Sequence, residues 1–209
     1  MNPFSNFTKS ELKLFDRLNT PKKIQDFLET IPPSLRDSSF SPKRVLEKRR
    51  ANCIEGATLA AVILWYHGRK PLLLDLTSTE NDLDHVAALF RQNGCWGAIS
   101  KTNHAILRFR EPVYTSIREL AMSYFHEYFL DNGKKTMRTF SKPFDLSKIK
   151  DKSWITTQKP IWHIGDKLDQ SLHIKILTPK MVKNLRKADP IEIKAGKLKR
   201  WEKPRPLKK

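Results

Sequence analysis

Apolar residues in this chain gather in segments of helix length and in shorter runs typical of strands. Residues 21–31 illustrate the helical pattern, because Ile24, Phe27 and Leu28 share one face and Pro21 is favourable at the first helical position. Such patterns predict helices over residues 4–15, 21–31, 41–46, 53–67 and 117–130. Runs bounded by polar residues, Pro or Gly predict strands over residues 71–76, 85–90, 96–102, 105–109, 154–157 and 172–177.

The order of these segments predicts an α+β fold, in which helices come first and an antiparallel sheet then packs on the apolar helix at 53–67. Gly94 marks a hairpin turn between two of the strands. We expect a domain over residues 1–179, with its core at 41–130, followed by a basic, flexible C-terminal tail over 180–209.

Basic residues dominate the charge of the chain. It carries 40 Lys and Arg against 22 Asp and Glu, a net charge of +18. Residues 180–209 hold twelve basic side chains against three acidic ones, a net of +9 and therefore half of the excess. This segment could simply keep the protein soluble, or it could attract nucleic acid or another acidic partner by charge alone. No zinc-finger or RNP-type motif in the sequence indicates a dedicated base-reading domain.

Composition is that of a globular protein: hydrophobic residues make up 39% and the mean hydropathy is −0.56. No stretch reaches the roughly 18 to 20 apolar residues of a membrane span, and residues 1–9 show no signal-peptide pattern, so we expect a cytoplasmic protein. Cys53 and Cys95 are then expected to be free thiols. Because no paired Cys or His spacing suits zinc, neither a metal nor another cofactor is expected.

Cys53 is the strongest candidate for chemistry, because it begins an almost wholly apolar helix. The unpaired N–H groups at a helix N-terminus stabilise a thiolate, and the N–H of Cys53 itself can stabilise an oxyanion during acyl transfer. His85, which begins a strand, is the candidate base, expected to form an ion pair with Cys53 and later to protonate the leaving group.

A third residue should orient His85. If the two strands around Gly94 form a hairpin, Ser100 or a near neighbour comes level with His85 and can accept its ring N–H. Asn103 and Asp75 are alternatives. Asp84 is disfavoured, since alternation along the strand turns it away from His85. Cys95, between a turn glycine and a tryptophan, is expected to be inert.

These residues resemble a family. The fifty residues from 53 to 102, out of 209, resemble the core of the transglutaminase-like superfamily, whose papain-related fold orders its triad as Cys, His and Asp. Residues 96–102 (Trp-Gly-Ala-Ile-Ser-Lys-Thr) are similar to the family's strand of Trp, apolar residues, Asp, Pro and Thr. The flanking segments resemble bacterial proteins of that superfamily. The resemblance implies Cys53 as nucleophile, His85 as base and Ser100 at the position of the family's Asp.

The function implied by this resemblance is acyl transfer through a thioester, as in a cysteine protease, an amidase or a transglutaminase-like enzyme acting on a peptide or protein amide. The rival hypothesis is a non-catalytic binding protein of the same fold, whose basic surface takes nucleic acid or another acidic partner. In a third interpretation Cys53 and His85 are merely core residues. The sequence does not distinguish hydrolysis from transamidation, since these differ only in whether water or an amine attacks the thioester.

Overall fold

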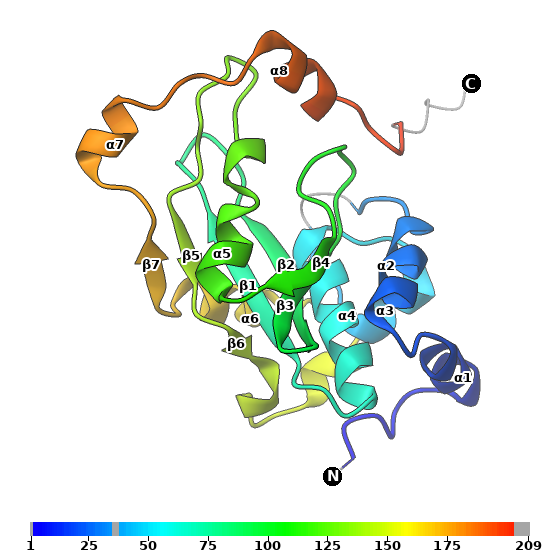
Figure 1. Cartoon of the computed structure of the whole chain (residues 1–209). Helices are drawn as coiled ribbons and strands as arrows, with labels where there is room; N and C mark the ends of the chain where they lie inside the picture. The colour runs from blue at the N-terminus through cyan, green and yellow to red at the C-terminus, as the bar shows by residue number, and fades with distance from the viewer. Residues whose placement is uncertain (1, 35–37, 203–209) are drawn as a thin grey trace, which may run out of the picture.

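The computed structural model of the chain describes residues 2–34 and 38–202. Its centre is an antiparallel sheet with the strand order β4-β3-β2-β1-β5-β7, in which β6 also pairs with β1 (Figure 1). The strands are β1 (Leu72–Thr77), β2 (His85–Gln92), β3 (Cys95–Ser100), β4 (Arg110–Tyr114), β5 (Thr139–Ser141), β6 (Phe144–Asp145) and β7 (His173–Lys175). The α-helices are α1 (Lys9–Arg17), α2 (Pro21–Glu29), α3 (Pro42–Lys48), α4 (Cys53–Tyr66), α5 (Ile117–Met122), α6 (Trp162–Asp169), α7 (Pro179–Lys183) and α8 (Pro190–Gly196).

Helix α4 begins at Cys53 because its N-terminus is capped. The Asn52 side chain accepts a hydrogen bond from the N–H of Glu55, and the Glu55 carboxylate accepts one from the N–H of Asn52. Almost every side chain that follows in α4 is buried, as its apolar sequence predicts. Gly56 allows the helix to lie against Lys101, since a Cβ at Gly56 would come within 2.5 Å of the Lys101 Cβ.

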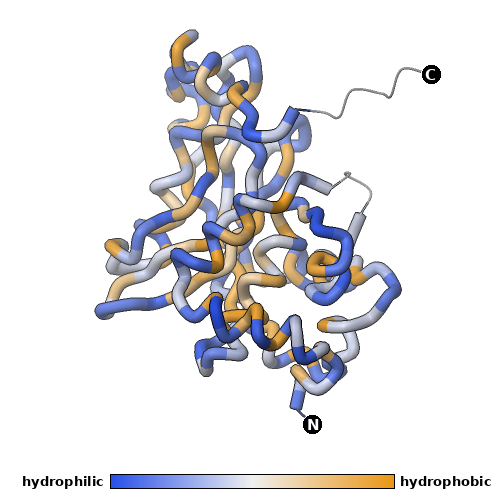
Figure 2. The backbone as a smooth tube through the Cα atoms, turned by 90° about the vertical axis from the view of Figure 1, so that its right-hand side faces the viewer, coloured by the Kyte–Doolittle hydropathy of each residue, from blue (hydrophilic) through white to orange (hydrophobic). Residues whose placement is uncertain are grey.

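The sheet separates two apolar clusters. Alternation along β2 directs Val86 and Ala88 toward α4, and Ala87 and Leu89 toward the opposite face. On the α4 side they pack with residues such as Leu59, Ile63, Leu73 and Ile99. On the other side they pack with Leu74, Leu76, Leu120 and Tyr124, of which the last two belong to α5 and the turn after it. Figure 2 shows apolar positions recurring along these central segments. The coarse prediction of helices and an antiparallel sheet is confirmed.

Several predicted elements are displaced. Residues 105–109 form no strand; the fourth strand of the meander is β4, which pairs with β3 across an irregularity between Trp96 and Ala98. The predicted helix at 117–130 is shorter, because α5 ends at Met122 and a 3₁₀ turn (Phe125–Glu127) follows. The predicted strand at 154–157 is also wrong, since Ser153–Ile155 is a 3₁₀ turn.

Much of the region predicted as a flexible tail is folded against the body. Two short helices, α7 and α8, lie within residues 179–196. Backbone hydrogen bonds join Ala105 N–H to Leu198 O at 3.0 Å and Arg200 N–H to Asn103 O at 2.9 Å. The remainder of the predicted tail, residues 203–209, lies outside the described residues. Among the helices that the structure describes, none has the length and apolar character needed to cross a bilayer.

Candidate thiol site

Cys53 is half-buried at the first position of α4, beside the start of β2. Burial raises the pKa of its thiol above the ordinary value. The N–H groups of Val86 and Ile54 point at the sulfur and act in the opposite direction, whereas the charge of Asp75 raises the pKa further. The N-terminal helical position therefore supplies donors, as expected, but burial outweighs them and favours the neutral thiol.

His85 and Ser100 are in direct contact. His85 Nε2 lies 2.7 Å from Ser100 Oγ, although the strand register pairs Ser100 with Ala87, two residues further along β2. The Ser100 hydroxyl donates its only proton to the Leu107 carbonyl oxygen. Ser100 Oγ must therefore accept a hydrogen bond from His85, which places the imidazole proton on Nε2 and leaves the lone pair on Nδ1.

Gln25 holds Ser100 in place from the other side of β3. Its side-chain Nε2 donates to Ser100 O and its Oε1 accepts from Ser100 N–H, each at 2.9 Å. Both side chains are buried. This amide on α2 thus replaces a strand that would otherwise pair with the end of β3, and nothing in the sequence periodicity indicated its role.

His85 is buried in an environment that disfavours the imidazolium. Burial, and then the positive charge of Arg110, lower the pKa of His85 to about 4. The Arg110 guanidinium lies 4.0 Å from the centre of the Tyr124 ring and forms an ion pair with Glu127 at 2.7 Å. These two contacts fix the Arg110 guanidinium beside Tyr124. The His85 ring lies on the same side of the sheet, with its centre 6.5 Å from that of the Tyr124 ring.

Cys53 and His85 lie at the same end of β2, since the N–H directed at the Cys53 sulfur belongs to the residue after His85. Within the described part of the chain no hydrogen bond joins the two side chains, and His85 Nδ1 has no partner. Both pKa shifts favour neutral forms. The resting state is therefore a thiol and a neutral imidazole rather than the ion pair expected from the sequence.

The alternative orienting residues have other partners. Asn103 exchanges two hydrogen bonds of 2.9 Å with the backbone of Trp201. Asp75 contacts His173, with Oδ2 3.0 Å from Nε2. Asp84 accepts hydrogen bonds from Ser78. Of these candidates, only Ser100 contacts His85. Cys95 is half-buried at the start of β3, away from Ser100 at its other end.

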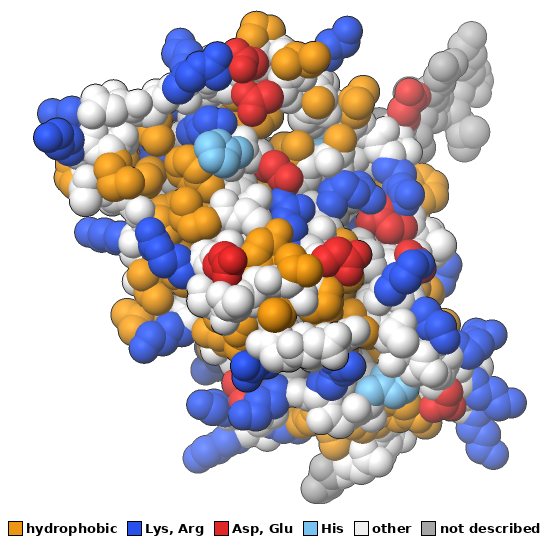
Figure 3. All heavy atoms as spheres, in the orientation of Figure 1, with side chains coloured by type: hydrophobic (Ala, Val, Ile, Leu, Met, Phe, Trp, Pro, Cys, Tyr) orange, Lys and Arg blue, Asp and Glu red, His pale blue; other side chains and the backbone are white. Residues whose placement is uncertain are grey.

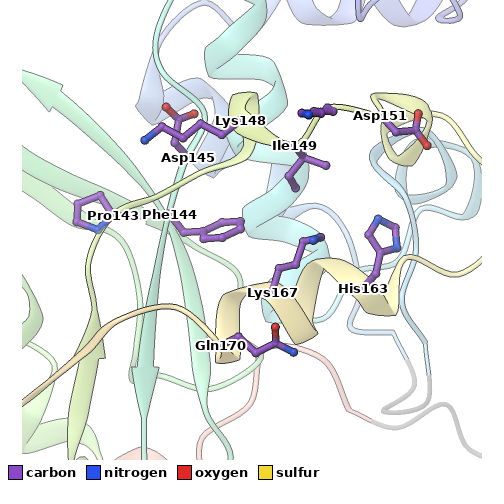
Figure 4. Close-up of a pocket in the computed structure, with 10 residues that line it drawn as sticks. Pro143, Phe144, Asp145, Lys148, Ile149, Asp151, His163, Lys167 and Gln170 are labelled. Atoms are coloured by element: carbon purple, nitrogen blue, oxygen red, sulfur yellow. The ribbon is translucent and has the colours of Figure 1, made fainter.

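An open groove of about 870 Å³ lies between α6 and the segment around β6 (Figure 4). Lys148, Lys167 and His163 line it together with Phe144, whose ring points into it. None of the residues lining this groove belongs to the predicted Cys-His-Ser site. Basic side chains are spread over the visible face of the molecule in Figure 3, with acidic ones between them, so they do not form one continuous basic patch there.

No protein-family model matches this chain, and a search of curated proteins also found no match. Over residues 2–34 and 38–202, no group of three or more His, Cys, Asp or Glu side chains is arranged to hold a metal ion. The geometry around Cys53 and His85 is therefore what indicates a function for this chain.

Proposed function

We propose that the protein is a cysteine-dependent hydrolase or acyltransferase that acts on peptide or amide bonds through a thioester at Cys53. The observation that carries the proposal is the tautomer of His85. Because Ser100 accepts a hydrogen bond from Nε2–H, the lone pair of the imidazole is on Nδ1, and the residue after His85, Val86, directs its N–H at the Cys53 sulfur.

In the proposed reaction the Cys53 sulfur attacks the substrate carbonyl carbon while its proton passes to His85 Nδ1. The N–H groups of Cys53, Ile54 and Val86, which act on the Cys53 sulfur, are the donors that this scheme assigns to the developing oxyanion. His85 then gives this proton to the leaving amine, which departs as the C–N bond breaks and leaves a thioester. Water or an amine completes the cycle by attacking the thioester carbonyl. Since thiol and imidazole both begin neutral, proton transfer accompanies attack rather than preceding it.

Ser100 is a positioning residue in this scheme. Its hydroxyl fixes the tautomer and the ring orientation, but it has no charge with which to stabilise an imidazolium. We therefore expect slower chemistry than a carboxylate in this position would support. The burial of His85 acts in the same direction, because the imidazolium formed during the reaction is poorly solvated.

The test is acetyl transfer from p-nitrophenyl acetate, an activated ester that needs no knowledge of the natural substrate. With Cys95→Ser as background, mass spectrometry should find one acetyl group on the Cys53 peptide. Cys53→Ala should abolish this acetylation, and His85→Ala should slow it by about 100-fold or more. Equal acetylation rates with and without His85 would contradict the proposal.

A second candidate function is a non-catalytic protein that binds a polyanion. It is favoured by the exposed lysines of α7, α8 and their flanks, including Lys180, Lys183, Lys187, Lys194 and Lys199. Binding of this kind should weaken steeply with salt and be unaffected by Cys53→Ala. Single-stranded DNA of mixed sequence, titrated at several salt concentrations, distinguishes it from the acyl-transfer proposal.

A further inference from the structure

A row of polar residues crosses the α4 side of the sheet from β1 to β7. Asp75 is the cross-strand neighbour of Val86 on one side, and its N–H donates to Ser141 Oγ at 2.9 Å on the other. Ser141 in turn pairs with His173 in the register of β5 and β7. Because these positions lie level across neighbouring strands, their side chains share one face.

Asp75 and His173 form a buried pair within this row. The Asp75 side chain is 2% exposed and that of His173 is 16% exposed, and Oδ2 lies 3.0 Å from Nε2. His173 Nδ1 lies 2.8 Å from Ser171 O, a carbonyl that can only accept, so Nδ1 carries a proton. A hydrogen bond between Nε2 and Oδ2 then requires a second proton, held by either atom.

The pair lies next to the thiol. Val86, the cross-strand neighbour of Asp75, is the residue whose N–H points at the Cys53 sulfur. The charge of Asp75 raises the pKa of Cys53, and burial, opposed by the contact with His173, raises the pKa of Asp75 to about 6. The other ionisable groups around Asp75 are Asp84, before β2, Asp169, at the end of α6, and Tyr128.

We propose that Asp75 and His173 share one proton and that loss of this proton holds Cys53 in its thiol form. The inference rests on the proposed function in one respect, since it assigns the pair a regulatory role at the same nucleophile. With the shared proton present, the pair is neutral overall and thiolate formation is opposed less. Once the proton is lost, the buried negative charge of Asp75 acts on Cys53 and opposes thiolate formation. The two residues are positioning residues, because they act through Cys53.

Iodoacetamide labelling of Cys53 tests this coupling without any substrate, so its outcome is independent of whether acyl transfer is found. In a Cys95→Ser background, the logarithm of the labelling rate should rise with pH, flatten while the pair loses its proton, and rise again. In Asp75→Asn the flattening should disappear, and labelling above neutral pH should be faster by about three- to tenfold. The asparagine amide can still donate to His173 Nε2, which preserves the contact.

Asp169→Asn is the matched control. It also removes one carboxylate near Asp75, but its side chain is exposed at the end of α6 and its charge is not among those that act on Cys53. The flattening should persist in this variant. If Cys53 in the Asp75→Asn variant is labelled with the same pH profile as Cys53 in the wild-type chain, the proposal is overturned.

The reciprocal measurement covers the case in which Asp75→Asn fails to fold. Cys53→Asp places a carboxylate at the first position of α4, where acidic residues are favourable, and Cys53→Asn is its neutral counterpart. NMR titration of the Asp75 carboxyl should give a higher midpoint in Cys53→Asp than in Cys53→Asn, by about half a pH unit or more. Identical midpoints would show that no coupling exists between Cys53 and the pair.

Discussion

Ser100 Oγ lies 2.7 Å from His85 Nε2 and accepts a hydrogen bond from Nε2–H, because the serine hydroxyl already donates to the Leu107 carbonyl. This relationship determines which nitrogen of His85 can act as a base. It connects a hairpin, a loop and the N-terminal helix α2, whose Gln25 holds the Ser100 backbone.

Ser100→Ala should impair both stability and the proposed chemistry. It leaves the buried Nε2–H without an acceptor and costs about 1–3 kcal/mol of unfolding free energy. Acetyl transfer to Cys53 should fall by roughly 10- to 100-fold, because the ring loses its fixed tautomer. Ser41→Ala, which removes another buried serine hydroxyl that donates to a backbone carbonyl, is the control. It should lower the urea midpoint and leave the transfer rate unchanged; an equal loss of rate in both variants would make the Ser100 effect merely structural.

The pH dependence of stability should reveal two opposing groups. The pKa of His85 falls from 6.5 to about 4 on folding, so its contribution is present above 6.5 and is lost as the pH falls through 4. The pKa of Asp75 rises from 3.8 to about 6, so its contribution is present below 3.8 and is lost as the pH rises through 6. Between about pH 4 and pH 6 the two contributions change in opposite directions, so the unfolding free energy varies little with pH.

The Asp75→Asn variant lacks the contribution of Asp75 to the pH dependence of stability. Its unfolding free energy, compared with that of the wild-type chain, should decline by about 2–3 kcal/mol on acidification from pH 6 to pH 4, because the opposing slope of His85 remains. Urea unfolding at a series of pH values measures this difference. A difference between the two proteins that does not vary with pH would exclude the raised pKa of Asp75.

Gly56→Ala should destabilise the protein, although alanine ordinarily favours a helix interior by about 1 kcal/mol. The added Cβ would lie 2.5 Å from the Lys101 Cβ, and Lys101 is buried with its Nζ donating to Ile31 O at 2.6 Å. We expect a loss of about 1–3 kcal/mol from overpacking. Gly165→Ala in α6 is the control, since its Cβ would meet only Ile54 Cδ1 at 3.7 Å. That variant should be neutral or more stable by thermal unfolding.

Glu29 should anchor the C-terminal segment. Its half-buried carboxylate forms an ion pair with Arg108 at 2.6 Å and a second ion pair with Arg200. Glu29→Gln should expose residues 197–202 to limited proteolysis and lower stability by about 1–2 kcal/mol. Asp26→Asn removes an exposed pair with Lys22 in the same helix and should change stability by less than about 0.5 kcal/mol. Equal proteolysis of the two variants would argue against the anchor.

The sequence predicted those features that depend on local pattern. The apolar run after Cys53 and the apolar runs on either side of Gly94 were sufficient to predict α4, β2 and β3, and with them the approach of Ser100 to His85. The pair of Asp75 and His173 could not be predicted, because the residues are 98 positions apart and meet through β5 and β7, strands of three residues each. Such short strands carry no periodic signal.

The two helices within the basic C-terminal region were missed for a related reason. Its composition resembles that of a solvated segment, yet α7 and α8 each have a capped N-terminus with proline at the first turn. Thr178 caps α7 and Asp189 caps α8, and both caps could have been found from the sequence. The contacts of Arg200 with Glu29 and Asn103 could not, since they depend on where the chain returns to the body.

The most direct test of the account is ¹⁵N NMR of the His85 side chain near neutral pH, with Ser100→Ala for comparison. The account predicts a proton on Nε2 and an unprotonated Nδ1 in the wild-type chain, with a mixture of tautomers once the Ser100 hydroxyl is removed. A proton on Nδ1 in the wild-type chain would contradict it, because the lone pair of His85 would then be on Nε2, which faces Ser100 and is not available to the Cys53 proton.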